Sequence, residues 1–140
     1  MISGFDHVVI AVRDLSAGVA AYETLLGRRA SAIETRDGIR TAFVATPNIS
    51  VEVMSPDGDG DGAQRLRAAL DTGEGLKSLV FATNDIAGAH RRCERVGLAP
   101  EAINERASWR SFRLGTARTR GVRLFVLERD GQPAGAAGAT

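Results

Sequence analysis

The fold is decided by the stretch Gly4-Phe5-Asp6-His7-Val8-Val9-Ile10-Ala11-Val12-Arg13-Asp14-Leu15, because the chain contains it twice. A second version, Gly75-Leu76-Lys77-Ser78-Leu79-Val80-Phe81-Ala82-Thr83-Asn84-Asp85-Ile86, begins 71 residues later. Each version is a run of β-branched and apolar residues that leads into a stretch with apolar residues at helical spacing, which predicts a strand followed by a helix. The chain is therefore predicted to contain two copies of one module.

The remaining elements of each module follow from turn signals. After the first helix, which is expected to end at Gly27, strands are predicted at 31–36, 39–46 and 49–54. The second copy repeats the order, with a strand at 76–83, a helix from Asp85 or Ile86 to Val96, and strands near 101–105, 109–114 and 122–128. Both modules are therefore predicted to be βαβββ units.

The predicted fold class is α+β, in which two tandem βαβββ modules form a curved, cavity-lining mixed sheet with the helices outside. The first module is expected at 1–56 and the second at 75–129, joined by a linker loop and short helix at 57–74. The last stretch, 130–140, is rich in Gly and Ala and is expected to be a disordered tail. At 140 residues the two modules would share one core and form a single globular domain.

Composition narrows the possible partners and compartments. The formal net charge of +1 provides no field to recruit nucleic acid or an anionic membrane. The single cysteine, Cys93, cannot form an intramolecular disulfide, and no apolar run approaches the length of a membrane span. Because the N-terminus also lacks the basic region of a signal peptide, a cytoplasmic location is expected.

The opening stretch, continued through Tyr22 and Leu26 to Gly27, closely resembles the start of the vicinal oxygen chelate superfamily. That superfamily includes glyoxalase I, methylmalonyl-CoA epimerase, extradiol dioxygenases, fosfomycin-resistance enzymes and bleomycin-resistance proteins. The resemblance extends from Phe5 to Glu128 and implies the fold described above. It leaves the activity open, because one fold hosts several chemistries and also non-enzymatic binding.

The resemblance also implies where a divalent metal ion would bind. In metal-dependent members each module supplies a histidine from its first strand and a carboxylate from its last strand. His7 matches the first-module histidine and Glu52 the first-module carboxylate, whereas the corresponding positions of the second module fall on Ser78 and Phe125. Two protein ligands are few for a catalytic metal site. The candidate cofactor is a divalent ion (Zn, Mg, Mn, Ni or Fe) whose remaining ligands would be substrate or water, and the alternative is no cofactor.

Glu52 and His7 are also the candidate catalytic residues for a metal-independent reaction. Strand alternation directs both side chains toward the predicted cavity. There Glu52 can abstract a proton next to a carbonyl, and His7 can assist as an acid or a hydrogen-bond donor. The plainer interpretations are a histidine that is hydrogen-bonded to a neighbour and an exposed carboxylate on a strand.

Candidate substrate-binding residues lie in the second module. Arg113 and Arg123 belong to an arginine-rich segment and are candidates for holding a carboxylate or phosphate at the cavity rim. Ser78, Trp109 and Phe125 are expected to line the same cavity. The alternative is that the arginines are solvated charges and that Trp109 is an ordinary core residue. RNA binding is disfavoured because strand alternation sends the arginines and aromatic residues to both faces.

Three further features have structural interpretations. His90 is expected at the surface or at an interface, and Cys93, three residues later on the same helix, is expected in the core. The repeated Asp-Gly pairs at 57–62 resemble the start of a calcium-binding EF-hand loop, but its twelfth position would be Ala68, which has no oxygen ligand to offer. This stretch is interpreted as a flexible acidic linker.

Two classes of function remain open at this point. The first is a lyase or isomerase of the glyoxalase or epimerase type that moves a proton beside a carbonyl, and it is supported by His7 and Glu52. The second is a small-molecule binding protein of the bleomycin-resistance type, supported by Ser78 and Phe125, which are suited to packing. On resemblance, a homodimer that binds a small molecule is expected, and the arginines would suit an anionic one.

Overall fold

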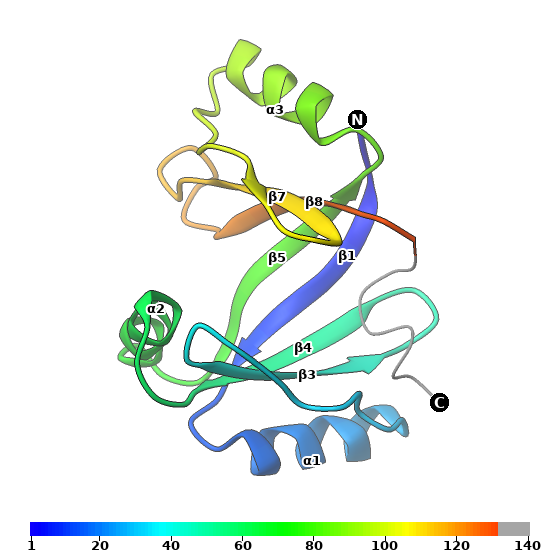
Figure 1. Ribbon diagram of the computed structural model, residues 1–140, viewed down its shortest axis with the longest axis vertical. Coiled ribbons are helices and arrows are strands. Elements are labelled where there is room, and N and C mark those ends of the chain that lie inside the picture. Colours follow the sequence, from blue (N-terminus) through cyan, green and yellow to red (C-terminus); the bar gives the residue numbers. More distant parts are fainter. Residues whose placement is uncertain (132–140) are drawn as a thin grey trace. The chain divides into compact units, whose positions relative to one another are not determined.

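The structure of the chain is a computed structural model that describes residues 1–131 (Figure 1). Its elements are β1 (Ile2–Ala11), α1 (Leu15–Leu26), β2 (Glu34–Arg36), β3 (Ile39–Ala45), β4 (Ser50–Pro56), α2 (Asp61–Leu70), β5 (Gly75–Thr83), α3 (Ile86–Arg95), β6 (Asn104–Glu105), β7 (Trp109–Leu114) and β8 (Leu124–Arg129). The tail expected at 130–140 lies outside the described residues except for Asp130 and Gly131. Within the described residues, no helix is long and apolar enough to cross a membrane.

The order of the elements confirms the predicted α+β class, with the βαβββ pattern written twice. The sheet is mixed, because β5 pairs with β8 in parallel whereas β2–β3, β3–β4, β6–β7 and β7–β8 are antiparallel. Two strands are shorter than expected, namely β2 and β6. All residues of β2 and β6 are exposed. Each strand is therefore limited to the few residue pairs that it forms with β3 or β7.

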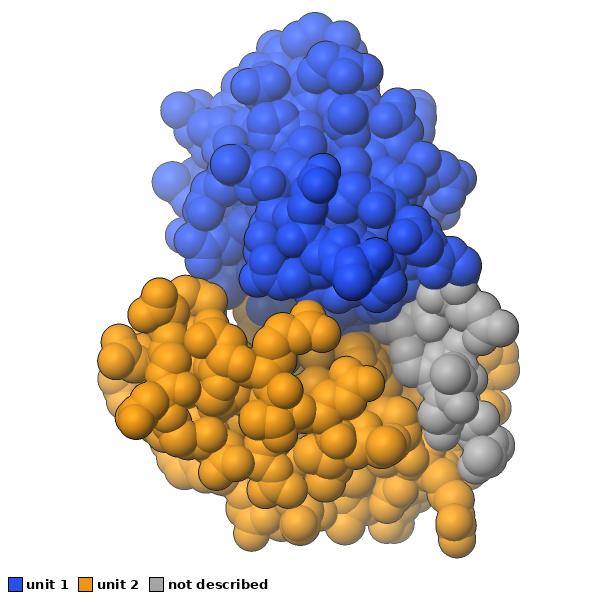
Figure 2. Space-filling view, viewed as in Figure 1, with its two compact units in different colours: residues 1–7, 78–133 blue, residues 8–77, 134–140 orange. Residues whose placement is uncertain are grey.

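The described chain divides into two compact units (Figure 2). One unit contains residues 1–7 and 78–131, and the other contains residues 8–77. The strand order is β2-β3-β4-β1-β5-β8-β7-β6, and both β1 and β5 have residues in each unit. The first seven residues therefore belong with the elements of the second copy, so the compact units do not coincide with the two sequence repeats.

In the unit of residues 8–77, the two helices pack on opposite faces of the strands. Helix α1 is capped by Asp14, whose side chain accepts a hydrogen bond from the Ala17 amide, and it ends at Gly27 in the left-handed region. It packs on Ile10, Val12 and Val53. The linker helix α2 instead packs through Leu66 and Leu70. These two leucines contact Ala11, Ile39 and Met54. Because neighbouring strand residues point to opposite sides, α2 covers the face opposite α1.

The first turn of α2 is capped from a distant part of the chain. The Asp37 carboxylate Oδ2 accepts a hydrogen bond from the Gly62 amide at 2.7 Å, and the Asp37 carbonyl accepts one from the Ala63 amide at 3.1 Å. The cap residue itself, Gly60, has no side chain for this purpose. A Cβ at Gly60 or Gly62 would lie within 2.7 Å of an Asp37 carboxylate oxygen. Because Gly60 and Gly62 have no Cβ, the β2–β3 turn that contains Asp37 can lie directly against the start of α2.

In the unit of residues 1–7 and 78–131, α3 covers one face of β7 and β8 (Figure 1). The core beneath it contains Ile86, Ala89, Phe112, Leu114 and Val126. Cys93 packs against this core, as predicted, and burial raises the pKa of its thiol. His90 is half-buried, with 17 % of its side chain exposed. Its Nε2 lies 2.9 Å from the Glu101 carbonyl oxygen, and its ring meets Phe112 edge-on.

Replacing Asp37 with alanine should lower the free energy of unfolding by about 1 to 2 kcal/mol, because α2 loses its cap. Asp37→Asn should lose less, since asparagine keeps an acceptor oxygen and tolerates the positive φ of 54° at this position. Urea unfolding measures both values. Asp59→Ala, at an exposed position of the loop between β4 and α2, is the control and should change the free energy by less than about 0.5 kcal/mol. Equal effects of Asp37→Ala and Asp59→Ala would contradict the capping role.

Candidate active site

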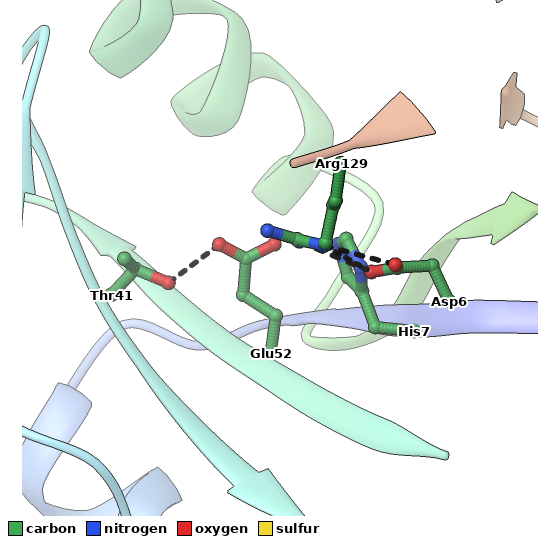
Figure 3. Close-up of polar contacts among 5 residues, drawn as sticks. All are labelled: Asp6, His7, Thr41, Glu52 and Arg129. Atoms are coloured by element: carbon green, nitrogen blue, oxygen red, sulfur yellow. Dashed lines mark hydrogen bonds and ion pairs between the residues drawn. The ribbon is translucent and has the colours of Figure 1, made fainter. Parts of the chain in front are cut away.

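His7 is held by the residue directly before it in the chain. Its Nδ1 lies 2.7 Å from Oδ1 of Asp6 (Figure 3). Only 5 % of His7 and 7 % of Asp6 are exposed, so this contact is shielded from water. The plainer interpretation of His7, a hydrogen bond to a neighbouring residue, is therefore correct for one of its ring nitrogens.

The buried carboxylate of Asp6 also forms an ion pair with Arg129, the last residue of β8, whose side chain is 21 % exposed. Arg129 Nε lies 2.9 Å from Oδ2 and 3.2 Å from Oδ1 of Asp6, and Arg129 Nη2 lies 3.1 Å from Oδ1 (Figure 3). This forked contact uses both carboxylate oxygens, the geometry that makes arginine–carboxylate pairs strong and directional. Asp6 is thus fixed between an imidazole and a guanidinium.

The surroundings of Asp6 keep it ionised. Burial by itself would raise the pKa of this carboxyl group, because it disfavours the charged form. The hydrogen bonds from His7 and Arg129, together with their charges, outweigh burial and hold the pKa below its ordinary value of 3.8. The carboxylate therefore acts as an acceptor toward both partners at neutral pH.

The sequence patterns did not identify Asp6 or Arg129 as site residues. In a regular strand adjacent side chains point to opposite faces, so alternation separates Asp6 from His7, although the structure brings them into contact. Arg129 lies 123 positions from Asp6 in the chain. The sequence signal that could have identified Asp6 is its position directly before His7 in the opening stretch. Arg129 could have been found only as a basic residue at the end of a predicted strand.

Four predicted substrate-binding residues share the sheet face that α3 does not cover. The register pairs Trp109 with Arg129, Arg113 with Phe125, and Val80 with Phe125. Since Phe112, Leu114 and Val126 lie under α3, the residues that alternate with them face the other side. The predicted residues on that side are Ser78, Trp109, Arg113 and Phe125. Arg123, the fifth predicted residue, is exposed just before β8 begins.

These residues differ in what they can offer a ligand. Ser78 is buried and Phe125 is half-buried. Trp109 is half-buried, and the guanidinium of Arg106 lies 5.7 Å from its ring centroid. Arg113 forms a forked ion pair with Glu101, at 3.0 and 3.2 Å. An anion at Arg113 would therefore compete with an existing carboxylate, which weakens the expectation that Arg113 anchors a substrate.

Glu52 lies on β4, in the unit of residues 8–77. Its side chain is half-buried rather than exposed, and Thr41 Oγ1 donates a hydrogen bond to its Oε2 at 2.8 Å (Figure 3). By strand alternation Glu52 shares its face with Met54, which is the face that α2 covers. A carboxylate oxygen is an acceptor and can act as a base.

The residues do not fit a metal centre of the kind that the fold family implies. Ser78 and Phe125 offer a weak hydroxyl ligand and a hydrocarbon where the second module would supply its ligands. Residues 1–131 contain no group of three or more His, Cys, Asp or Glu side chains that could hold a metal ion. We therefore assign no chemical step to a metal.

Comparisons with known proteins agree with this fold. A family described as the glyoxalase-like domain matches residues 5–138. The ethylmalonyl-CoA/methylmalonyl-CoA epimerase of Cereibacter sphaeroides is 31 % identical over 99 residues, which cover 69 % of this chain and 73 % of that protein.

Solved structures show the same similarity. The crystal structure of methylmalonyl-CoA epimerase from Mycobacterium tuberculosis has a TM-score of 0.81 at 26 % identity, covering 93 % of this chain and 90 % of that one. A Streptomyces coelicolor methylmalonyl-CoA epimerase in complex with 2-nitronate-propionyl-CoA has a TM-score of 0.78 at 20 % identity, covering 96 % and 99 %. At that identity the second similarity concerns the fold alone.

Replacing Arg129 with glutamine should lower the free energy of unfolding at pH 7 by about 2 to 3 kcal/mol, because a buried carboxylate loses its partner. The folded-state pKa of Asp6 is depressed, so this stabilisation is present above the ordinary pKa of 3.8. It should diminish as the pH falls from there through the folded-state pKa. Urea unfolding at a series of pH values measures the difference.

The control for this prediction is Arg110→Gln. Arg110 pairs with Asp130, whose side chain is 61 % exposed, so its loss should lower stability much less than the loss of Arg129. If the difference between wild type and Arg129→Gln were the same at pH 7 and at pH values well below 3.8, the buried pair would not have the assigned role.

Proposed function

The chain belongs to the glyoxalase-like domain family of the vicinal oxygen chelate superfamily, and from that premise we propose that it is an isomerase. In this proposal it moves a proton at the carbon next to the carbonyl of a CoA ester. The relatives reported above at 31 % and 26 % identity carry epimerase names, which supports this reaction class. A CoA ester is also anionic, which agrees with the small anionic ligand expected from the sequence.

The observation that carries the proposal is the buried contact between Asp6 and His7. A histidine whose Nδ1 is bound to a carboxylate is suited to proton transfer at Nε2, because the carboxylate stabilises the imidazolium that forms. A histidine that only fills space in a core needs no such partner. The ion pair with Arg129 keeps that carboxylate charged.

Inversion at a carbon next to a carbonyl requires two acid–base groups, because the proton leaves from one face and returns to the other. We assign removal of the proton from one face of the α-carbon to Glu52 and delivery of a proton to the other face to His7. The two residues belong to the same first-copy pattern that the sequence identified. Ser78, Trp109 and Phe125 would contact the acyl group, and Arg123 would contact a phosphate of the CoA moiety.

The homodimer and the cytoplasmic location expected from the sequence belong to this proposal. Protonation chemistry on a CoA ester is a reaction of a soluble metabolite, and it requires no membrane partner. Sedimentation of the purified protein would establish whether the chain pairs with a second copy.

Methylmalonyl-CoA or ethylmalonyl-CoA incubated with the protein in D₂O should gain one deuterium at the α-carbon, measured by mass spectrometry. Glu52→Gln should slow this exchange by at least about 100-fold, because the amide cannot accept the proton. Glu94→Gln, at an exposed position on α3, should exchange at the wild-type rate. Tight binding of either ester without exchange would instead indicate the binding-protein alternative.

Elemental analysis of the purified protein should give less than one equivalent of divalent metal per chain, because His7 and Glu52 are too few ligands for tight binding. The same measurement on Glu52→Ala is the comparison. Stoichiometric metal in wild type that is lost on this substitution would contradict the acid–base roles and make His7 and Glu52 ligands.

A further inference from the structure

Charge is divided unevenly between the two compact units. Residues 1–7 and 78–131 contain ten arginines against seven Asp and Glu, whereas residues 8–77 contain eight Lys and Arg against ten Asp and Glu. The formal net charge of +1 therefore combines a basic unit with an acidic one. An anionic ligand is attracted to the basic unit, which also carries Ser78, Trp109 and Phe125.

The arginines of the basic unit differ in whether other residues already bind them. Three form ion pairs with carboxylates and two donate hydrogen bonds to oxygens of the protein, namely Arg110, Arg113 and Arg129 in the first group and Arg106 and Arg118 in the second. No hydrogen bond or ion pair joins the side chain of Arg120 or Arg123 to another residue that the structure describes. The remaining arginines of the unit lie on α3, on the opposite side of the sheet from Phe125.

Arg120 and Arg123 belong to the loop that connects β7 to β8, residues 115–123 (Figure 1). This β7–β8 loop contains no Asp or Glu, and all its residues except Thr119 are exposed. It is closed by its own contacts: the Gly121 amide donates to the Thr116 carbonyl at 2.9 Å, and Arg118 Nη1 donates to the Gly97 carbonyl at 3.1 Å. The loop therefore holds two exposed guanidinium groups on a backbone that is itself hydrogen-bonded.

The backbone of Arg123 directs its side chain toward the predicted ligand face. The Arg123 carbonyl accepts a hydrogen bond from the Leu79 amide at 3.1 Å, which continues the parallel pairing of Leu79 with Leu124. Arg123 therefore follows the alternation of β8, and its side chain lies on the same face as that of Phe125. The loop thus meets this face at its end, next to the start of β5.

The length of this face matches the length of a CoA ester. Trp109 pairs with Arg129 at the far end of β8 from Arg123, and the six steps from Arg123 to Arg129 span about 20 Å. The arm that joins the thioester of CoA to its diphosphate is a linear chain with two amide groups, comparable with between four and five residues of extended peptide, or about 15 Å. A ligand with its acyl end at Trp109 would therefore pass Phe125 and bring its phosphates to Arg123.

We propose that the β7–β8 loop is the phosphate-binding element for CoA, in which Arg123 contacts the diphosphate and Arg120, farther out on the loop, contacts the 3′-phosphate of the ribose. Guanidinium groups suit this role because they present paired N–H donors to phosphate oxygens. The inference rests on the proposed function, in which the ligand is a CoA ester. It extends that function by assigning the selection of CoA over dephospho-CoA, which lacks the 3′-phosphate, to Arg120.

Binding of CoA, dephospho-CoA and pantetheine, measured by isothermal titration calorimetry at low salt, tests the assignment of each arginine. Arg120→Gln should weaken the binding of CoA at least about fivefold but change that of dephospho-CoA less than about twofold, because dephospho-CoA has no partner for Arg120. Arg123→Gln should weaken both ligands at least about fivefold and leave pantetheine, which has no phosphate, unchanged.

Arg91→Gln is the matched control, since it removes the same charge from an exposed position on α3. Its Kd for CoA should stay within about twofold of the wild-type value, because separated exposed charges are screened. All three positions are exposed, so the variants should keep the wild-type Tm. In proton exchange on a CoA ester, Arg120→Gln and Arg123→Gln should raise KM by the same factors as Kd, with kcat within about twofold, since uniform binding is lost.

Three results would overturn the inference: equal Kd values of wild type for CoA and dephospho-CoA, an Arg120→Gln effect as large on dephospho-CoA as on CoA, or a loss in Arg91→Gln equal to that of the loop variants. The calorimetry requires no turnover. The expected binding pattern without exchange on either ester would overturn the isomerase function and support the phosphate-binding loop. Exchange with a wild-type KM in both loop variants would overturn the loop assignment and support the isomerase.

Discussion

The structure depends on the buried ion pair between Asp6 and Arg129, which joins the first strand of the chain to the last. A buried carboxylate without a partner would destabilise the fold by several kcal/mol, and Arg129, at the end of β8, supplies Asp6 with an opposite charge. The pair explains why residues 1–7 form a compact unit with residues from the second copy. It also makes the fold and the candidate site inseparable, because the carboxylate that completes the ion pair also holds His7.

The two copies of the module have the same backbone plan but different chemistry. The first copy keeps His7 and Glu52, whereas the second has Ser78 and Phe125 at the matching positions. In the unit of residues 1–7 and 78–131, Ser78, Trp109 and Phe125 share the sheet face of Arg129, and Trp109 is its cross-strand partner. Such a face suits an acyl group next to a single proton-transfer group. The asymmetry also explains why the ligand set expected of metal-dependent relatives is not complete here.

The sequence patterns correctly predicted the features of the fold that depend on residues close together in the chain. The β1–α1 and β5–α3 pairs and the end of α1 at Gly27 follow from neighbouring residues and were predicted correctly. The capping of α2 by Asp37, the face on which α2 packs and the Asp6–Arg129 pair depend on residues distant in sequence, and periodicity carries no information about them. Asp6 and His7 are neighbours in the chain, and ideal strand alternation would point their side chains to opposite faces. The sequence therefore identified His7 but neither of the two residues that hold it, Asp6 and Arg129.

The central claim is that Asp6 and Arg129 act as one energetic unit, and a double-mutant cycle tests it most directly. The free energy of unfolding would be measured at pH 7 for wild type, Asp6→Asn, Arg129→Gln and the double variant. Residues in direct contact through a charged hydrogen-bonded pair should show a coupling free energy of at least about 1.5 kcal/mol. Additive effects, with a coupling below about 0.3 kcal/mol, would contradict the account.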